Sequence, residues 1–135
     1  MVNNPMDIES TFVVVNKDLS AETVAVNDNL WAEIDQRFGD FAGCSLISSF
    51  SFEHDWPTWE VHPHGDEFVC LLSGDAEMTL ALPDGDKIVH LTEPGSFIIV
   101  PVGTWHTAKV NVPTKMLFVT PGQGTENRDQ PIRDD

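Results

Sequence analysis

The sequence of 135 residues contains no tyrosine. A phenol side chain serves many enzymes as an acid, a base or a nucleophile, so every mechanism that needs one from this chain is excluded. Lysine and arginine are also scarce, with 7 of them against 22 aspartate and glutamate residues, and the formal net charge is −15. Such an acidic surface repels phosphate backbones and anionic membranes. We therefore expect neither a nucleic-acid partner nor a membrane partner.

Long apolar runs are absent and cysteines are few. No run approaches the roughly 20 apolar residues that a membrane-spanning helix needs. The opening residues MVNNPMDIES hold polar and acidic side chains where a cleaved secretory signal would have basic residues and then an apolar stretch. Cys44 and Cys70 are too few for a disulfide scaffold and are typical of buried thiols in a reducing compartment. These features predict a cytoplasmic protein.

The length fits a single domain over residues 1–135. One short helix is predicted at 30–38, because Leu30, Ile34 and Phe38 follow a helical spacing and Gly39 comes next. Beyond it, short segments rich in Val, Ile, Phe, Leu and Thr alternate with turn residues, which is typical of an all-β sandwich or barrel. The expected strands are 11–15, 44–54, 59–64, 67–72, 76–82, 87–91, 96–100, 105–111 and 116–120, and a polar loop or tail is expected over 121–135.

The positions of the histidines indicate a possible metal site. His62 and His64 are two residues apart, so on a strand both imidazoles point to the same face. Glu67 follows shortly afterwards, and His106 comes from a distant strand. Imidazole nitrogens and carboxylate oxygens suit divalent first-row metals, and three nitrogens with one oxygen leave two positions of an octahedral ion open. Such a site is able to hold a bidentate substrate.

These residues resemble the cupin family, whose first motif is G-x5-H-x-H-x3,4-E-x6-G and whose second is G-x5-P-x-G-x2-H-x3-N. The matching residues are His62, His64, Glu67 and Gly74 for the first motif, and Gly95, Pro101, Gly103 and His106 for the second. The resemblance covers about residues 45–120 and implies a double-stranded β-helix, or jelly-roll barrel. It also implies one divalent ion per chain, with iron, manganese, nickel and zinc as candidates, bound by His62, His64, Glu67 and His106.

Three positions depart from the family pattern. Trp56 stands where the first motif has Gly, and Val110 replaces the final Asn of the second motif. Only two residues separate His64 from Glu67. This shortened gap leaves Asp66 as an alternative carboxylate ligand, although Glu67 keeps the expected spacing to Gly74.

A metal enzyme normally also needs a group that transfers protons. Glu60 shares strand parity with His62 and is the first candidate, and His54, at the end of an alternating strand, is the second. Each residue also has an interpretation without a catalytic role. Glu60 would then be an exposed carboxylate at the end of a strand, and His54 a histidine at the rim that is hydrogen-bonded to a backbone carbonyl.

The function that these residues favour is a metal-dependent enzyme acting on a small organic molecule, most simply a dioxygenase-like oxidoreductase. A cupin lyase, decarboxylase or isomerase, and a non-catalytic module that binds or senses a small ligand, are the alternatives. We also expect a homodimer, in which the strand around 12–15 pairs across a two-fold axis and covers an open sheet edge.

Overall fold

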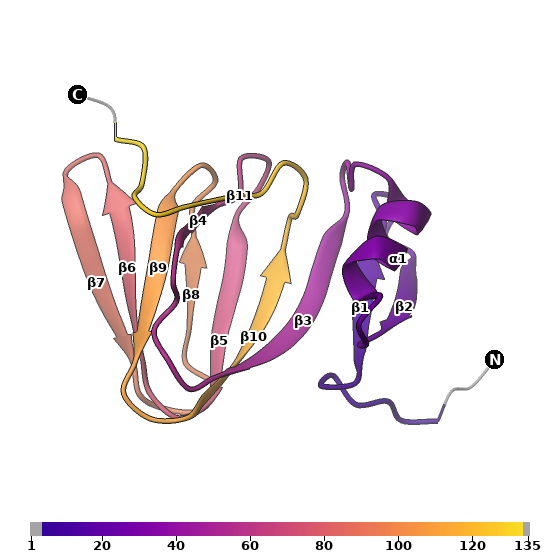
Figure 1. Cartoon of the computed structure of the whole chain (residues 1–135), viewed down its shortest axis with the longest axis horizontal. Helices are drawn as coiled ribbons and strands as arrows, with labels where there is room; N and C mark the ends of the chain where they lie inside the picture. The colour runs from indigo at the N-terminus through magenta and orange to yellow at the C-terminus, as the bar shows by residue number, and fades with distance from the viewer. Residues whose placement is uncertain (1–3, 134–135) are drawn as a thin grey trace.

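The computed structural model describes residues 4–133, in which antiparallel strands form two sheets beside one helix (Figure 1). The six-stranded sheet has the order β2 (Ala21–Ala25), β1 (Thr11–Val15), β3 (Ser45–Phe52), β10 (Thr114–Thr120), β5 (Glu67–Ser73) and β8 (Phe97–Val100). The five-stranded sheet has the order β11 (Glu126–Arg128), β4 (Trp59–Val61), β9 (Trp105–Val110), β6 (Ala76–Leu82) and β7 (Gly85–Leu91). The helix is α1 (Leu30–Phe38). The expected all-β jelly roll with one short helix is confirmed.

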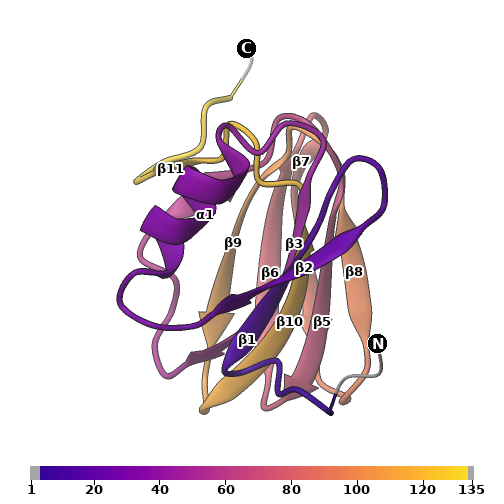
Figure 2. The same ribbon diagram turned by 90° about the vertical axis from the view of Figure 1, so that its right-hand side faces the viewer.

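The main core lies between the two sheets, which face each other in Figure 2. Strand β6 shows how the sequence builds it, because Ala76, Met78 and Leu80 are buried while the residues between them are not. Successive side chains of a strand point to opposite faces, so this alternation buries one face only. Val69 and Leu71 of β5 complete the contact from the opposite sheet.

A second cluster of buried residues joins α1 to β1 and β2, at the end of the molecule opposite β7 (Figure 1). Leu30 and Ile34 are the buried residues of α1, as their spacing predicts. They pack with Phe12 and Val14 of β1. The first sheet is thus extended beyond the region of the family resemblance, and α1 is held beside β3.

Two strands were not predicted. Strand β2 buries only Val24, and all three residues of β11 are exposed, so neither has the alternating hydrophobicity that marks a strand. Backbone pairing forms them instead: β2 pairs with β1, and β11 pairs with β4. Strand β11 lies within the stretch 121–135 that we expected to be a loop or tail.

Two strands near the predicted site end earlier than expected. Strand β4 stops at Val61, and Pro63, which has no backbone N–H to donate, lies in the turn that follows. His62 and His64 therefore do not share a strand face. Strand β3 stops at Phe52, where its partner β10 begins at Thr114, so the predicted place of His54 on the buried face of a strand is wrong.

Strand β1 lies between β2 and β3 of the same chain and pairs with both. Both of its edges are occupied, so the expected pairing of this strand across a two-fold axis is wrong. The homodimer itself stays a prediction. Within residues 4–133, no helix is long and apolar enough to cross a membrane.

Candidate metal centre

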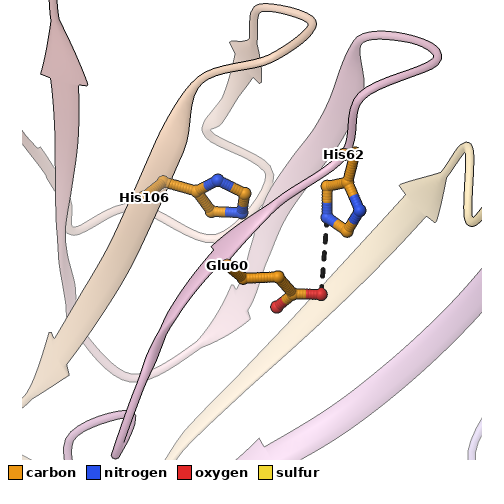
Figure 3. Close-up of side chains that lie close together, drawn as sticks. All are labelled: Glu60, His62 and His106. Carbon is orange, nitrogen blue, oxygen red and sulfur yellow. Dashed lines mark ion pairs between the residues drawn. The ribbon is translucent and has the colours of Figure 1, made fainter. Parts of the chain in front are cut away.

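Four side chains from both sheets meet at one end of the barrel. Glu60 of β4 and His106 of β9 are direct cross-strand partners, so their side chains lie on the same face. His62 follows immediately after β4, and Glu67 is the first residue of β5 in the other sheet. Figure 3 shows Glu60, His62 and His106 turned toward one another. The jelly roll thus gathers residues that are far apart in the sequence.

Three side chains of this cluster, Glu60, His62 and His106, are within the reach of a single ion, and Glu67 contacts both imidazoles. His62 Nε2 lies 3.4 Å from Glu60 Oε1 and 3.2 Å from Glu67 Oε2. His106 Nε2 lies 3.1 Å from Glu67 Oε1. One ligand atom each from Glu60, His62 and His106 lies within 4.8 Å of the other two. His62, Glu67 and His106 are almost fully buried, whereas Glu60 keeps about a quarter of its side chain exposed (27%).

Hydrogen bonds outside the cluster fix the orientation of both imidazoles. The Thr125 hydroxyl donates to the carbonyl of Gly122 and is therefore left as an acceptor for His62 Nδ1, 2.8 Å away. His106 Nδ1 donates to the carbonyl of Thr104 at 3.0 Å. With the proton on Nδ1, each ring turns the lone pair of Nε2 into the cluster.

The atoms that face each other in the cluster are not hydrogen-bonded. The distances from Glu67 to the two imidazoles are those of ion pairs, but the contacts lack the direction of a hydrogen bond. His62 Nε2, His106 Nε2 and Glu67 Oε1 are consequently buried without a partner in the part of the chain that is described. The other oxygen of Glu67 accepts a hydrogen bond of 2.6 Å from the Thr120 hydroxyl. Buried acceptors left open in this way are what a cation satisfies.

The ionisation of the cluster follows from burial and mutual contact. Burial alone would raise the pKa of Glu67, but the neighbouring His106 and His62 lower this pKa to about 2. Burial opposes the charging of His106, yet its contact with Glu67 raises the pKa of this imidazole. Burial also raises the pKa of Glu60. Without an ion, the contact between Glu67 and His106 thus favours the charged form of both side chains.

This arrangement predicts a stability optimum for the metal-free protein in weak acid. The contribution of Glu67 is lost as the pH falls from its ordinary pKa of 4.5 toward 2, since the folded state holds the carboxylate charged. The contribution of His106 is lost as the pH rises above 6.5 and through the raised folded-state pKa, and charging of buried Glu60 adds to this decline. Thermal unfolding with a chelator, followed between about pH 3 and 9, is expected to give the highest Tm between these limits.

The matched variant for this prediction is Glu67→Gln, in which the acid limb of the profile is expected to flatten. An acid limb unchanged in Glu67→Gln, or a Tm that keeps rising above pH 7 in the wild type, would contradict it.

The structure brings three of the four predicted metal ligands together. His64 lies exposed in the turn after β4 and is not part of the cluster. Asp66 is exposed too, and its Oδ1 accepts a hydrogen bond from the Val102 amide. The cluster holds Glu60 in addition. His54 is exposed in the bend after β3 and lines the pocket described below.

The position of Glu60 agrees with the family motif read two residues earlier. Glu60-x-His62-x4-Glu67 satisfies H-x-H-x3,4-E if glutamate occupies the first position. The gap before Glu67 is then of ordinary length. This spacing was a signal in the sequence that pointed to Glu60, whereas nothing marked Thr125 or Thr104 as the residues that orient the imidazoles.

A pocket of about 1000 Å³ leads from the surface to the cluster, and Glu60 and Glu67 form part of its lining. Aromatic residues from α1, the loop after α1, β3, the loop after β3, and β10 form part of its walls. They are Trp31, Phe41, Phe50, Phe52, Trp56 and Phe118. The cluster is therefore open to a ligand of moderate size on one side and enclosed by protein on the others.

Comparison with known proteins identifies the fold. No protein-family model matches the chain, and a search of curated proteins finds no match. Among solved structures, an uncharacterized conserved protein with a double-stranded β-helix domain from Klebsiella pneumoniae matches with a TM-score of 0.52 and 24% identity, over 64% of this chain and 76% of that one. An oxalate oxidase matches with a TM-score of 0.52 and 13% identity, over 60% of this chain and 44% of that one.

A mutant of Bacillus subtilis oxalate decarboxylase has a TM-score of 0.50 and 18% identity, over 63% of this chain and 23% of that one. The chain spans less than half the length of several matched proteins, including 42% of Fe(II)-HppE. With its two sheets, the chain thus has a double-stranded β-helix fold.

Proposed function

We propose that His62, Glu67 and His106 bind one divalent metal ion per chain, with Glu60 beside the ion as the group that transfers protons, and that the protein is a metal-dependent enzyme acting on a small organic molecule. The observation that carries this proposal is the convergence of two buried Nε2 atoms and Glu67 Oε1, all without hydrogen-bond partners, beside the pocket. Two carboxylates also balance the charge of a divalent ion. Iron, manganese, nickel and zinc all accept such mixed nitrogen and oxygen ligands.

The donor set favours an oxidoreductase of the dioxygenase type. Two histidines with one carboxylate and open positions are the set that binds non-heme Fe(II) in oxygenases, and His62 and His106 with Glu67, which contacts both, would supply it. A bound metal would polarise the oxygen atoms of a substrate and, if it is iron, bind dioxygen. The aromatic walls of the pocket hold the substrate body and limit the access of water.

Within this proposal, Glu60 accepts a proton from the substrate. It is the partly exposed member of the cluster, it lines the pocket, and burial raises its pKa, which makes the carboxylate a stronger base. His54 lines the same pocket and is the second candidate, although it is exposed and lies outside the cluster.

The proposal is tested on protein purified without an immobilised-metal column. Metal analysis is expected to find about one divalent ion per chain. Oxygen consumption is then screened with catechols, thiols, diketones and hydroxy acids. Protein that binds no metal contradicts the proposed centre, whereas stoichiometric metal without turnover of any compound favours a binding or sensing module, and turnover without oxygen uptake favours a lyase or isomerase.

Thr125 is expected to act on the metal through His62. Replacing Thr125 by valine removes the acceptor that holds Nδ1 of His62, so the affinity for a divalent ion should fall about 10- to 100-fold. Competition titration with a chromogenic chelator measures this change, and Thr125→Ser should restore most of the affinity. Equal affinity in Thr125→Val and the wild type would contradict the orientation assigned to His62.

A further inference from the structure

The lining of the pocket carries charge of one sign only. Its acidic members are Asp35, Asp40, Glu53, Asp55, Glu60 and Glu67, and no lysine or arginine of residues 4–133 contributes to it. None of the four carboxylates outside the cluster forms an ion pair with a described residue. A divalent ion would balance Glu60 and Glu67, so the other four leave a negative potential along the route to the cluster.

The walls of the pocket suit a flat or extended apolar body. Trp31 lies on α1 with 59% of its surface exposed, and its ring is stacked on Phe50 at a centroid distance of 6.5 Å. Trp56, on the loop after β3, packs against Phe52 at 5.6 Å and Phe118 at 6.0 Å. The faces of indole rings attract cations as well as other aromatic rings. Acidic groups and indoles thus favour the same kind of ligand.

A buried polar atom, which the proposed metal ion would satisfy, lies at the inner end of the pocket. Glu67 is 3% exposed and lines the pocket, and its Oε1 has no hydrogen-bond partner. The pocket therefore ends in a group that needs a positive charge or a donor. An anionic molecule would share this pocket with four carboxylates that form no ion pair with a described residue, at a cost in affinity, although Asp40 and Asp55 each accept a hydrogen bond from a backbone amide.

We propose that the natural substrate is a small organic cation, with an aromatic or alkyl body between Trp31 and Trp56 and an ammonium group near the rim carboxylates. This inference rests on the proposed function, because it names the substrate class of the same site. A cationic substrate would distinguish the protein from enzymes that act on oxalate, because a small dianion matches neither the charge nor the apolar walls of this pocket.

Three probes that share a phenyl ring and differ in charge test this proposal: phenethylamine, 2-phenylethanol and 3-phenylpropionate. Their binding is measured by calorimetry and tryptophan fluorescence at pH 8, on chelator-treated protein and on protein loaded with Zn²⁺. The amine is expected to bind at least about tenfold more tightly than the acid in both forms, with the alcohol in between. The difference should shrink as salt is added.

Two variants separate the charged rim from the aromatic wall. The double variant Asp35→Asn/Glu53→Gln should reduce the ratio of amine affinity to acid affinity several-fold. The control is Asp84→Asn/Glu93→Gln, which removes the same charge from exposed residues outside the pocket and should leave this ratio unaltered. Trp31→Ala should weaken the binding of all three probes, and Trp31→Phe should restore part of it.

Binding of the acid as tight as that of the amine would overturn the proposal, and so would a lack of amine binding at about 10 mM. The charge preference of chelator-treated protein and the metal content are separate readouts. A protein that prefers the amine but binds no metal contradicts the metal centre alone, and one that binds metal but prefers the acid contradicts the substrate class alone.

Discussion

Replacing His106 by alanine is expected to remove tight metal binding. His106 is fully buried, its Nε2 faces Glu67, and no other described histidine besides His62 lies in the cluster. Loss of a ligand that is oriented in this way should lower the affinity for a divalent ion by on the order of 10²-fold or more. Chelator competition and metal analysis of purified protein measure the effect. His106→Gln keeps more of the side-chain volume and guards against a result that reflects misfolding.

His64→Ala is the matched control for this experiment. His64 belongs to the family motif as first aligned, but it is exposed in the turn after β4. Its removal is expected to leave metal content and affinity unchanged, and the same holds for His90, which is exposed and bonded to Asp75. A large loss of metal in His64→Ala with little loss in His106→Ala would contradict the assignment of the centre.

Glu60→Gln is expected to lower turnover by on the order of 10²-fold or more, once the screen has provided a substrate. The amide keeps the shape of the side chain and can still form hydrogen bonds, but it cannot accept a proton. Metal should still bind at saturating concentration, because His62, His106 and Glu67 remain. The rate constant of the substrate reaction and the metal content must be measured on the same preparation.

The matched variants for Glu60 are His54→Ala and Glu53→Gln, which also alter the lining of the pocket. Near-normal turnover in Glu60→Gln together with a large loss in His54→Ala would move proton transfer to His54. Loss of metal in Glu60→Gln at saturating concentration would instead make Glu60 an indispensable ligand.

The periodicity of the sequence was sufficient for most of the fold. Helix 30–38 and strand 76–82 have the predicted bounds, because in both the buried side chains recur at the period of the element. Strand β11 could not be found in this way, since Glu126, Asn127 and Arg128 are all exposed and only the backbone of β4 selects their conformation. Pairing partners are a property of the tertiary structure and leave no local pattern.

The site was predictable in part for the same reason. The resemblance to the family motifs implied His62, His64, Glu67 and His106 as ligands, but the parity argument that placed His64 beside His62 assumed a strand continuing past Pro63. The chain turns there, so His64 reaches the surface, and Glu60 takes the place facing His106. Thr125 comes from a distant loop, and no spacing in the sequence connects it to His62. The carbonyl of Thr104 lies only two residues before His106, but a backbone acceptor leaves no pattern of side chains.

The most direct test of the proposed centre is anomalous diffraction from crystals of the protein grown with Mn²⁺ or Co²⁺. The expected result is one strong peak per chain, about 2.0–2.3 Å from the Nε2 atoms of His62 and His106 and from an oxygen of Glu67. A peak that includes His64 and omits His106, or the absence of any peak at the cluster in crystals that contain the metal, would contradict the account.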